Sequence, residues 1–289
     1  MTNRSLERLL VEAAETRDID RVREIIAAGA DLRARLPDGF PITFVTTSHE
    51  IRLLMLDSGA DVNSRCSDGT TLLHVESMFG PEEVQALISR GADVSACNDH
   101  VETPLFYATD GDQPEVIDLL VANGADVNWK SLDQGWTSLH AAAASGRPRA
   151  AEALLRNGAD IEARDRLGIT PLMVACYMDL KKSDIANVFL AHGADVNAAS
   201  KEGARPLHYV ASEGRDSLIT RLLQAGADIN AITCDGETPL DTAIRKQHSS
   251  TAQLLREKGA TRGRTRPRGK GPCRTNERSD KNRFSSPNP

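Results

Sequence analysis

Aromatic residues are scarce in this sequence. They make up 4% of the 289 residues, with two Trp, three Tyr and six Phe, so a core must be built mostly of Leu, Ile, Val and Ala. No apolar run approaches the roughly 18 residues that would predict a membrane-spanning helix. The N-terminus also lacks the apolar stretch and small-residue cleavage site of a secretory signal. We therefore expect a cytoplasmic chain without a membrane span.

Cysteines are few, and their spacing is uninformative. Five lie at positions 66, 97, 176, 234 and 273, with no two within three residues of each other, which argues against a disulfide framework and a zinc site. The chain also has no Gly-rich phosphate loop, nucleophile elbow or His-Glu-x-x-His motif. The sequence therefore predicts no catalytic residues, no metal and no cofactor, and we expect that the protein is not an enzyme.

One short motif recurs along most of the chain. Gly-Ala-Asp occurs seven times at intervals of 30 to 35 residues, and Gly259 begins a decayed copy, Gly-Ala-Thr. An apolar pair precedes each glycine by four and three residues, as Leu222 and Leu223 precede Gly226, which predicts one buried helix face. Because glycine accepts the left-handed conformation of a helix C-cap, each copy predicts a helix end. The seven glycines are Gly29, Gly59, Gly91, Gly124, Gly158, Gly193 and Gly226.

A second motif follows each glycine by about twelve residues and predicts the start of another helix. It reads Thr-Pro-Leu at Thr103, Thr170 and Thr238. Threonine caps the free amides, proline fits the first helical position and leucine begins the buried face. Asp-Gly pairs such as Asp68-Gly69 come just before it and predict hairpins. Each unit is therefore a hairpin, a helix, a turn, a second helix and a glycine.

In register, these motifs resemble the ankyrin repeat, whose pattern is Asp-Gly-x-Thr-Pro-Leu-His, a helix of small residues, then Leu-Leu-x-x-Gly-Ala-Asp-Val-Asn. Residues 135–161 show it well. The resemblance covers roughly residues 5–261 and implies an all-α solenoid of stacked helix–turn–helix units with short β-hairpin fingers. We divide this ankyrin repeat domain, residues 1–261, into about eight repeats: 5–34, 38–66, 68–97, 101–130, 134–163, 167–198, 202–231 and 235–261.

Four repeats depart from the pattern. The first lacks Thr-Pro-Leu, and the last has Asp241 where histidine often stands, as suits terminal caps with a polar outer face. The second is short and rich in β-branched residues through 44–49, so we expect it to be the least regular internal repeat. The sixth is long, with the extra residues near 178–183, which predicts a surface loop.

Residues 262–289 differ in composition from the rest. They hold nine Lys or Arg against two acids, a net charge of +7 that leaves −13 on residues 1–261. With almost no apolar side chains, this basic tail is expected to be disordered alone. It is either an arm for nucleic acid, acidic protein or an anionic surface, or a nuclear-import signal, or a solvated segment that resists aggregation. A nuclear location therefore stays open beside the cytoplasm.

Three histidines share one repeat position. His74, His140 and His208 lie 66 and 68 residues apart, which is two repeats each, and stacked repeats would hold them beyond the reach of one metal ion. The resemblance implies a structural role instead, in which each histidine ties a hairpin to a helix by hydrogen bonds. The hairpin asparagines, Asn63, Asn128, Asn197 and Asn230, are expected to stabilise turns.

The resemblance also indicates where a partner would bind, because in this family the fingertips and first helices line a concave groove. Exposed Trp and Tyr are frequent hot spots of protein interfaces. Trp136 stands just before Thr-Ser-Leu-His, a position that resembles the exposed fingertip. We therefore predict a partner-binding face of Trp129, Trp136, Tyr107, Tyr209, Tyr177, Phe40, Met78 and Glu102.

The predicted function is binding of another protein by a monomeric chain, as a scaffold, adaptor or inhibitor. The acidic body would speed encounter with a partner that carries a basic patch. The alternative function is a factor associated with nucleic acid or an anionic surface and tethered through its basic tail. The sequence does not name the partner.

Overall fold

The computed structural model describes residues 3–36, 38–178 and 185–263. The loop predicted in repeat six and nearly all of the basic tail lie outside these residues. Within the described ranges the chain is helical, and its only extended pairings are isolated bridges between Arg35 and Pro41 and between Arg65 and Thr71. The all-α prediction is confirmed. None of the helices in these ranges is long and apolar enough to cross a bilayer.

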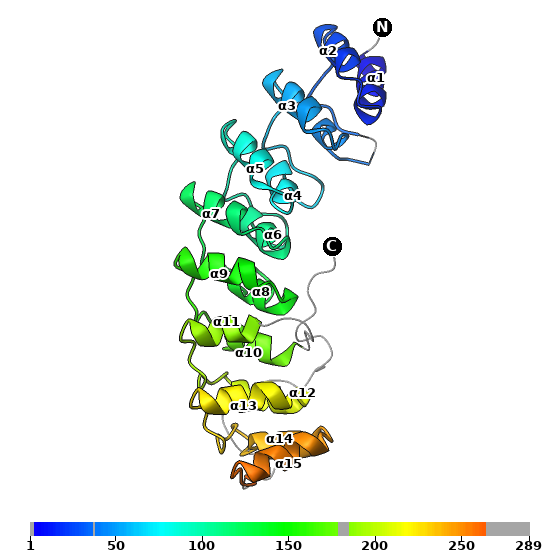
Figure 1. Ribbon diagram of the computed structural model, residues 1–289. Coiled ribbons are helices and arrows are strands. Elements are labelled where there is room, and N and C mark those ends of the chain that lie inside the picture. The colour runs from blue at the N-terminus through cyan, green and yellow to red at the C-terminus, as the bar shows by residue number, and fades with distance from the viewer. Residues whose placement is uncertain (1–2, 37, 179–184, 264–289) are drawn as a thin grey trace. The chain divides into compact units, whose positions relative to one another are not determined.

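The chain divides into two compact units, Met1–Asp126 and Val127–Pro289. Helix pairs follow one another in chain order within each unit (Figure 1). The first unit contains α1 (Asn3–Glu15), α2 (Ile19–Ala27), the 3₁₀ helix η1 (Ile42–Phe44), α3 (His49–Asp57), α4 (Leu72–Glu76), α5 (Pro81–Ile88), α6 (Pro104–Asp110) and α7 (Pro114–Ala122). The second contains α8 (Ser138–Ser145), α9 (Pro148–Arg156), α10 (Pro171–Tyr177), α11 (Ile185–Ala191), α12 (Pro206–Glu213), α13 (Asp216–Gln224), α14 (Pro239–Arg245) and α15 (Ser249–Glu257).

Neighbouring pairs share their buried faces within each unit. First helices contact first helices, as α4 contacts α6 and α10 contacts both α8 and α12, and second helices contact second helices, as α5 contacts α7 and α9 contacts α11. Leu105, Ile117, Leu139 and Phe189 are among the largest fully buried side chains. Burying each of them stabilises the fold by about 1.5–3 kcal/mol. Aliphatic packing between adjacent repeats therefore makes the core, as the scarcity of aromatics predicts.

The predicted helix ends are present. Gly226 has a φ of 90°, and it ends α13 with a hydrogen bond from the Ala227 amide to the Leu222 carbonyl of 2.9 Å. All seven Gly-Ala-Asp glycines have a positive φ. At the helix starts, Thr170 and Thr238 accept hydrogen bonds from backbone amides three residues later. Thr103 makes no such bond, so the cap prediction is wrong there.

The second repeat is the irregular one, as predicted. Its first helix is reduced to the three residues of η1. A buried ion pair links this repeat to the next: Arg52 Nη1 lies 2.6 Å from Glu76 Oε1, and each side chain is only 9% exposed. Arg52 Nη2 also donates to the Thr46 carbonyl, just after η1, at 2.7 Å. Charged contacts thus hold the segment where the helical pattern is weakest.

Hairpin asparagines connect adjacent fingers. Asn197 Nδ2 donates to the Gly226 carbonyl at 3.0 Å, and Asn197 Oδ1 accepts from the Asp228 amide at 2.9 Å. Asn63 bridges to Gly91 and Asp93 in the same way, and Asn128 to Gly158 and Asp160. The side chains of these asparagines therefore stabilise the junction between repeats.

We expect Asn197→Ala to lower the free energy of unfolding by about 1–2 kcal/mol, because two inter-finger hydrogen bonds are lost. Urea unfolding followed by circular dichroism measures this change. The chain offers its own control, since Glu162 stands at the same position one repeat earlier and its Oε1 accepts from the Asp195 amide at 2.7 Å. Asn197→Glu should therefore lose less stability than Asn197→Ala. Equal losses would show that these bonds do not carry the effect.

A second type of link joins the helix ends of adjacent repeats. The residue before a second helix donates to a carbonyl at the end of the preceding repeat's first helix. Gln113 Nε2 donates to the Met78 carbonyl at 3.1 Å, and Arg215 Nη1 donates to Ala175 and Met178 at 2.8 and 3.0 Å. Free carbonyls at the end of a helix need such partners. In these two places a repeat thus completes the helix end of the one before it.

Candidate partner-binding surface

The three shared histidines lie at the base of their hairpins. The Thr137 amide donates to His140 Nδ1 at 3.2 Å, and His140 Nε2 lies 3.0 Å from the Ile169 carbonyl of the next finger. Because Nδ1 accepts a backbone N–H, the ring hydrogen must be on Nε2, which donates to Ile169. His74 makes the same bonds with Thr71 and Glu102, and His208 makes them with Arg205 and Glu237. The hydrogen bonds expected of these histidines are therefore present.

Burial keeps these imidazoles neutral. It lowers the pKa of His74 and of His140 from 6.5 to about 4, although the hydrogen bonds to Glu102 and Ile169 act in the opposite direction. Burial lowers the pKa of His208 as well. A neutral ring keeps Nδ1 available as an acceptor. The neutral histidines therefore keep their hydrogen bonds at the base of the fingers.

In the first unit, two predicted residues meet in a small polar cluster. Asn98 Nδ2 donates to Glu102 Oε2 at 3.2 Å and to the Tyr107 hydroxyl at 3.3 Å. The Tyr107 ring also contacts His74 edge-on, with ring centroids 5.3 Å apart. Glu102 and Tyr107 are both half-buried. The cluster places a carboxylate and a phenol together at the junction of a finger and a first helix.

In the second unit, two predicted tyrosines meet. Tyr177 at the end of α10 and Tyr209 in α12 contact edge-on, with ring centroids 6.4 Å apart. Tyr177 is half-buried, whereas Tyr209 is only 8% exposed. Tyr209 therefore packs between neighbouring first helices, and the expectation that it lies open on the binding face is wrong. Tyr177 is the member of the pair that a partner can reach.

Trp136 is buried rather than exposed at a fingertip. Its side chain is 6% exposed and stacks on His140, with ring centroids 6.2 Å apart and the planes 17° from parallel. Burial raises the pKa of Asp165 in the next finger, and hydrogen bonds from the Ile169 and Leu167 amides and the Trp136 side chain partly offset this. Ile169, at the same position of the next finger, is also buried, with 4% exposed. The fingertip prediction for Trp136 is therefore wrong.

The other predicted residues are spread over the described chain. Phe40 is 40% exposed and contacts Phe44 edge-on. Met78 is half-buried in the turn after α4, away from the fingers, and Trp129 is half-buried in the hairpin before α8. The structure thus groups Glu102 with Tyr107 in the first unit and Tyr177 with Tyr209 in the second.

The Gly-Ala-Asp glycines lie at helix ends, and the Thr-Pro-Leu motifs begin helices. A profile for ankyrin repeats in three copies matches residues 45–131, 73–165, 128–200 and 172–265, which together cover most of the chain. The chain belongs to the ankyrin repeat family. Ankyrin repeats generally mediate protein–protein interaction.

Curated proteins with ankyrin repeats are similar to this chain over part of their length. It is 32% identical over 165 residues to the B-cell lymphoma 3 protein homolog of Mus musculus, over 54% of this chain and 37% of that protein. It is 31% identical over 210 residues to transient receptor potential cation channel subfamily A member 1 of Homo sapiens, over 69% of this chain and 18% of that protein. It is 30% identical over 180 residues to the nuclear factor NF-kappa-B p105 subunit of Gallus gallus, over 61% and 18%. The chain thus spans well under half of each relative.

Sequence reasoning missed the apolar side chains that the ankyrin fingers of the second unit expose. Leu132 is 54% exposed, Leu167 is 38% exposed and Ile232 is 59% exposed. Each is an apolar residue in a hairpin whose neighbouring residues are mostly polar. This pattern could have identified the three residues from the sequence. Backbone bonds hold these fingers in place: the Arg166 amide donates to Gln134, and the Lys201 amide to Leu167, both at 2.9 Å.

Proposed function

We propose that this ankyrin repeat chain binds a partner protein through its fingertips and the adjoining ends of its first helices. The observation that carries the proposal is the exposure of Leu132 and Leu167 on neighbouring fingers that backbone hydrogen bonds hold together. A rigid apolar surface loses little entropy when a complex forms. Tyr177 in the second unit and the Glu102–Tyr107 cluster in the first add amphipathic contacts of the kind found at hot spots. We propose no catalytic role for the chain.

The charge distribution supports a basic partner at the first unit. Residues 1–126 hold 23 Asp or Glu against 10 Arg and no Lys, a net charge of −13. Since residues 1–261 as a whole carry −13, residues 127–261 are neutral. We therefore propose that the partner presents basic residues to the first unit and apolar residues to the fingers of the second. Association should slow as salt is raised, because screening weakens electrostatic steering.

The fingertip proposal is tested with Leu132→Ser/Leu167→Ser in the full chain. Affinity purification from native-cell lysate identifies partners, and titration calorimetry with the purified partner measures the dissociation constant. We expect this variant to weaken binding by about tenfold or more, as loss of two apolar anchors does at protein interfaces. Its thermal unfolding should match that of the unmodified chain, because both side chains already contact water.

Phe79→Ser is the matched control, since Phe79 is 66% exposed but lies in the turn after α4, away from the fingers. It should bind the partner as the unmodified chain does. If both variants bind normally and deletion of residues 264–289 abolishes binding, the fingertip proposal fails. A steep salt dependence of that tail-dependent binding would then favour the alternative, a factor tethered to an anionic surface or nucleic acid by its basic tail.

A further inference from the structure

The last repeat changes the chemistry of the link between repeats. In three earlier repeats, histidine Nε2 donates to a carbonyl of the next finger, at 3.1 Å for His74, 3.0 Å for His140 and 3.1 Å for His208. The corresponding residue of α14 is Asp241, whose carboxylate can only accept hydrogen bonds when ionised. The last repeat therefore presents an acceptor where those three repeats present a donor.

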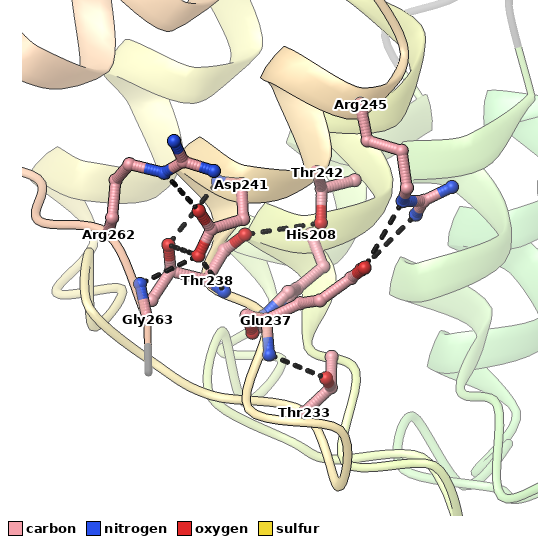
Figure 2. A network of polar contacts seen from close by, with 9 residues as sticks. All are labelled: His208, Thr233, Glu237, Thr238, Asp241, Thr242, Arg245, Arg262 and Gly263. Carbon is pink, nitrogen blue, oxygen red and sulfur yellow. Dashed lines mark hydrogen bonds and ion pairs between the residues drawn. The ribbon is translucent and has the colours of Figure 1, made fainter. Parts of the chain in front are cut away.

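The chain itself supplies the donors that Asp241 needs. Arg262 Nε donates to Asp241 Oδ1 at 2.8 Å, and the Gly263 amide donates to Asp241 Oδ2 at 2.7 Å (Figure 2). The Thr238 hydroxyl donates to Oδ2 at 2.9 Å from the side of α14. Burial raises the pKa of Asp241, but the hydrogen bonds from Arg262, Gly263 and Thr238 outweigh burial and lower it overall. The carboxylate, with a side chain only 6% exposed, is thus held ionised.

Residues 259–263 follow the course of another finger and then depart from it. The Thr261 amide donates to Asn230 Oδ1 at 2.7 Å, as the Asp228 amide donates to Asn197 one repeat earlier. The Thr238 hydroxyl oxygen also lies 3.0 Å from the Thr261 carbonyl. At Gly263 a side chain would collide with the Gly236 carbonyl, so only glycine allows this approach. The segment is a truncated finger laid across the start of α14.

We propose that Asp241, Arg262 and Gly263 form a latch that closes the outer end of the last repeat against a further ankyrin repeat, including one from a second copy of this chain. An incoming repeat would bring its finger carbonyl to the place where an earlier histidine donates. A carboxylate and a carbonyl are both acceptors and repel each other. The truncated finger also occupies the space that the first residues of an incoming finger need. The latch thus acts by charge and by shape.

The closed latch is tested by hydrogen exchange in the full chain. Asp241→Asn keeps the shape but removes the charge that Arg262 and Gly263 bind, so amides of residues 259–263 and α14 should exchange about tenfold faster or more. Glu237→Gln is the matched control: Glu237 pairs with Arg245 at 3.3 Å, on the opposite side of the same network from Arg262 (Figure 2). It should leave exchange unchanged. Unchanged exchange in Asp241→Asn would overturn the latch.

The end-closing role is tested by Asp241→His/Arg262→Ser, which restores the donor of the earlier repeats and removes one side of the latch. Sedimentation velocity over roughly 5–200 μM should show concentration-dependent self-association of this variant, while the unmodified chain stays monomeric. Gly263→Val should open residues 259–263 without self-association, because Asp241 still repels a carbonyl. Asp241→Asn/Arg262→Ser, closer in shape to the unmodified chain, should associate if the histidine variant loses helix content. Monomeric behaviour of both double variants would overturn the proposal.

Discussion

Arg52→Met is expected to lower the free energy of unfolding by about 3–5 kcal/mol, the usual cost of removing one partner of a buried ion pair. Burial raises the pKa of Glu76, and the adjacent Arg52 guanidinium offsets part of that rise. Without Arg52, the Glu76 carboxyl must take up a proton or remain charged and unpaired with Arg52 in a buried site. The Thr46 carbonyl also loses its donor. Urea unfolding monitored by circular dichroism measures the loss.

A second ion pair in the same unit provides the control. Arg90 binds Asp57 through two hydrogen bonds of 2.7 and 3.0 Å, but the pair is open to solvent. Arg90→Met should therefore change stability little. Arg52→Met/Glu76→Leu should recover most of the loss of Arg52→Met, because an apolar pair can replace a buried ion pair. If Arg52→Met and Arg90→Met were equally mild, the buried pair would not hold the irregular second repeat.

His140→Ala is expected to lower the free energy of unfolding by about 3 kcal/mol, because it leaves the Ile169 carbonyl and the Thr137 amide without their shared partner. It also removes the ring on which Trp136 stacks. The quenching and position of Trp fluorescence should change together with the urea midpoint. The control is His192→Ala, since His192 is exposed at the end of a second helix. Equal stability of the two variants would contradict the role assigned to the hairpin histidines.

Lowering the pH should destabilise the folded chain through the buried hairpin histidines. The pKa of His74 and of His140 is about 4 in the folded chain, against 6.5 ordinarily. Between these values the unfolded chain binds protons that the folded chain does not, so stability is complete above pH 6.5 and falls as the pH drops toward 4. Each histidine contributes up to about 3 kcal/mol to this loss. Urea midpoints between pH 7 and 4.5 should fall less steeply for His140→Ala than for the unmodified chain. Parallel curves would contradict this account.

The sequence predicts most of the repeated architecture because the responsible signals are local. Gly226 ends its helix and Thr238 begins the next one for reasons contained in a few neighbouring residues. The Arg52–Glu76 pair could not be predicted, since its two residues belong to different repeats at positions that share no pattern. A histidine replaced by Asp241 was visible in the sequence, but the hydrogen bonds that explain it come from residues beyond the last complete repeat.

The candidate binding face was harder to predict than the fold. Residue type and a position that resembles the fingertip favoured Trp136, but a finger residue faces solvent or the hairpin base according to its backbone direction. Trp136 lies on the inward side, over His140, whereas Leu132, four residues earlier, is exposed. A large aromatic in a hairpin therefore indicates a surface only once the direction of each residue is known. The tyrosines differ by their place in a helix: Tyr177, the last residue of α10, is half-buried, whereas Tyr209, within α12, is buried.

The links between fingers also bear on how the chain folds during synthesis. The histidine and asparagine hydrogen bonds between adjacent fingers join residues only 28 to 32 positions apart. Once a repeat has left the ribosome, only one more repeat must follow before its histidine and asparagine can form these hydrogen bonds. Contacts so close in sequence form quickly, and folding can advance by adding one repeat at a time. The last of these steps would be the closing of Asp241 on Arg262, once the root of the tail has emerged.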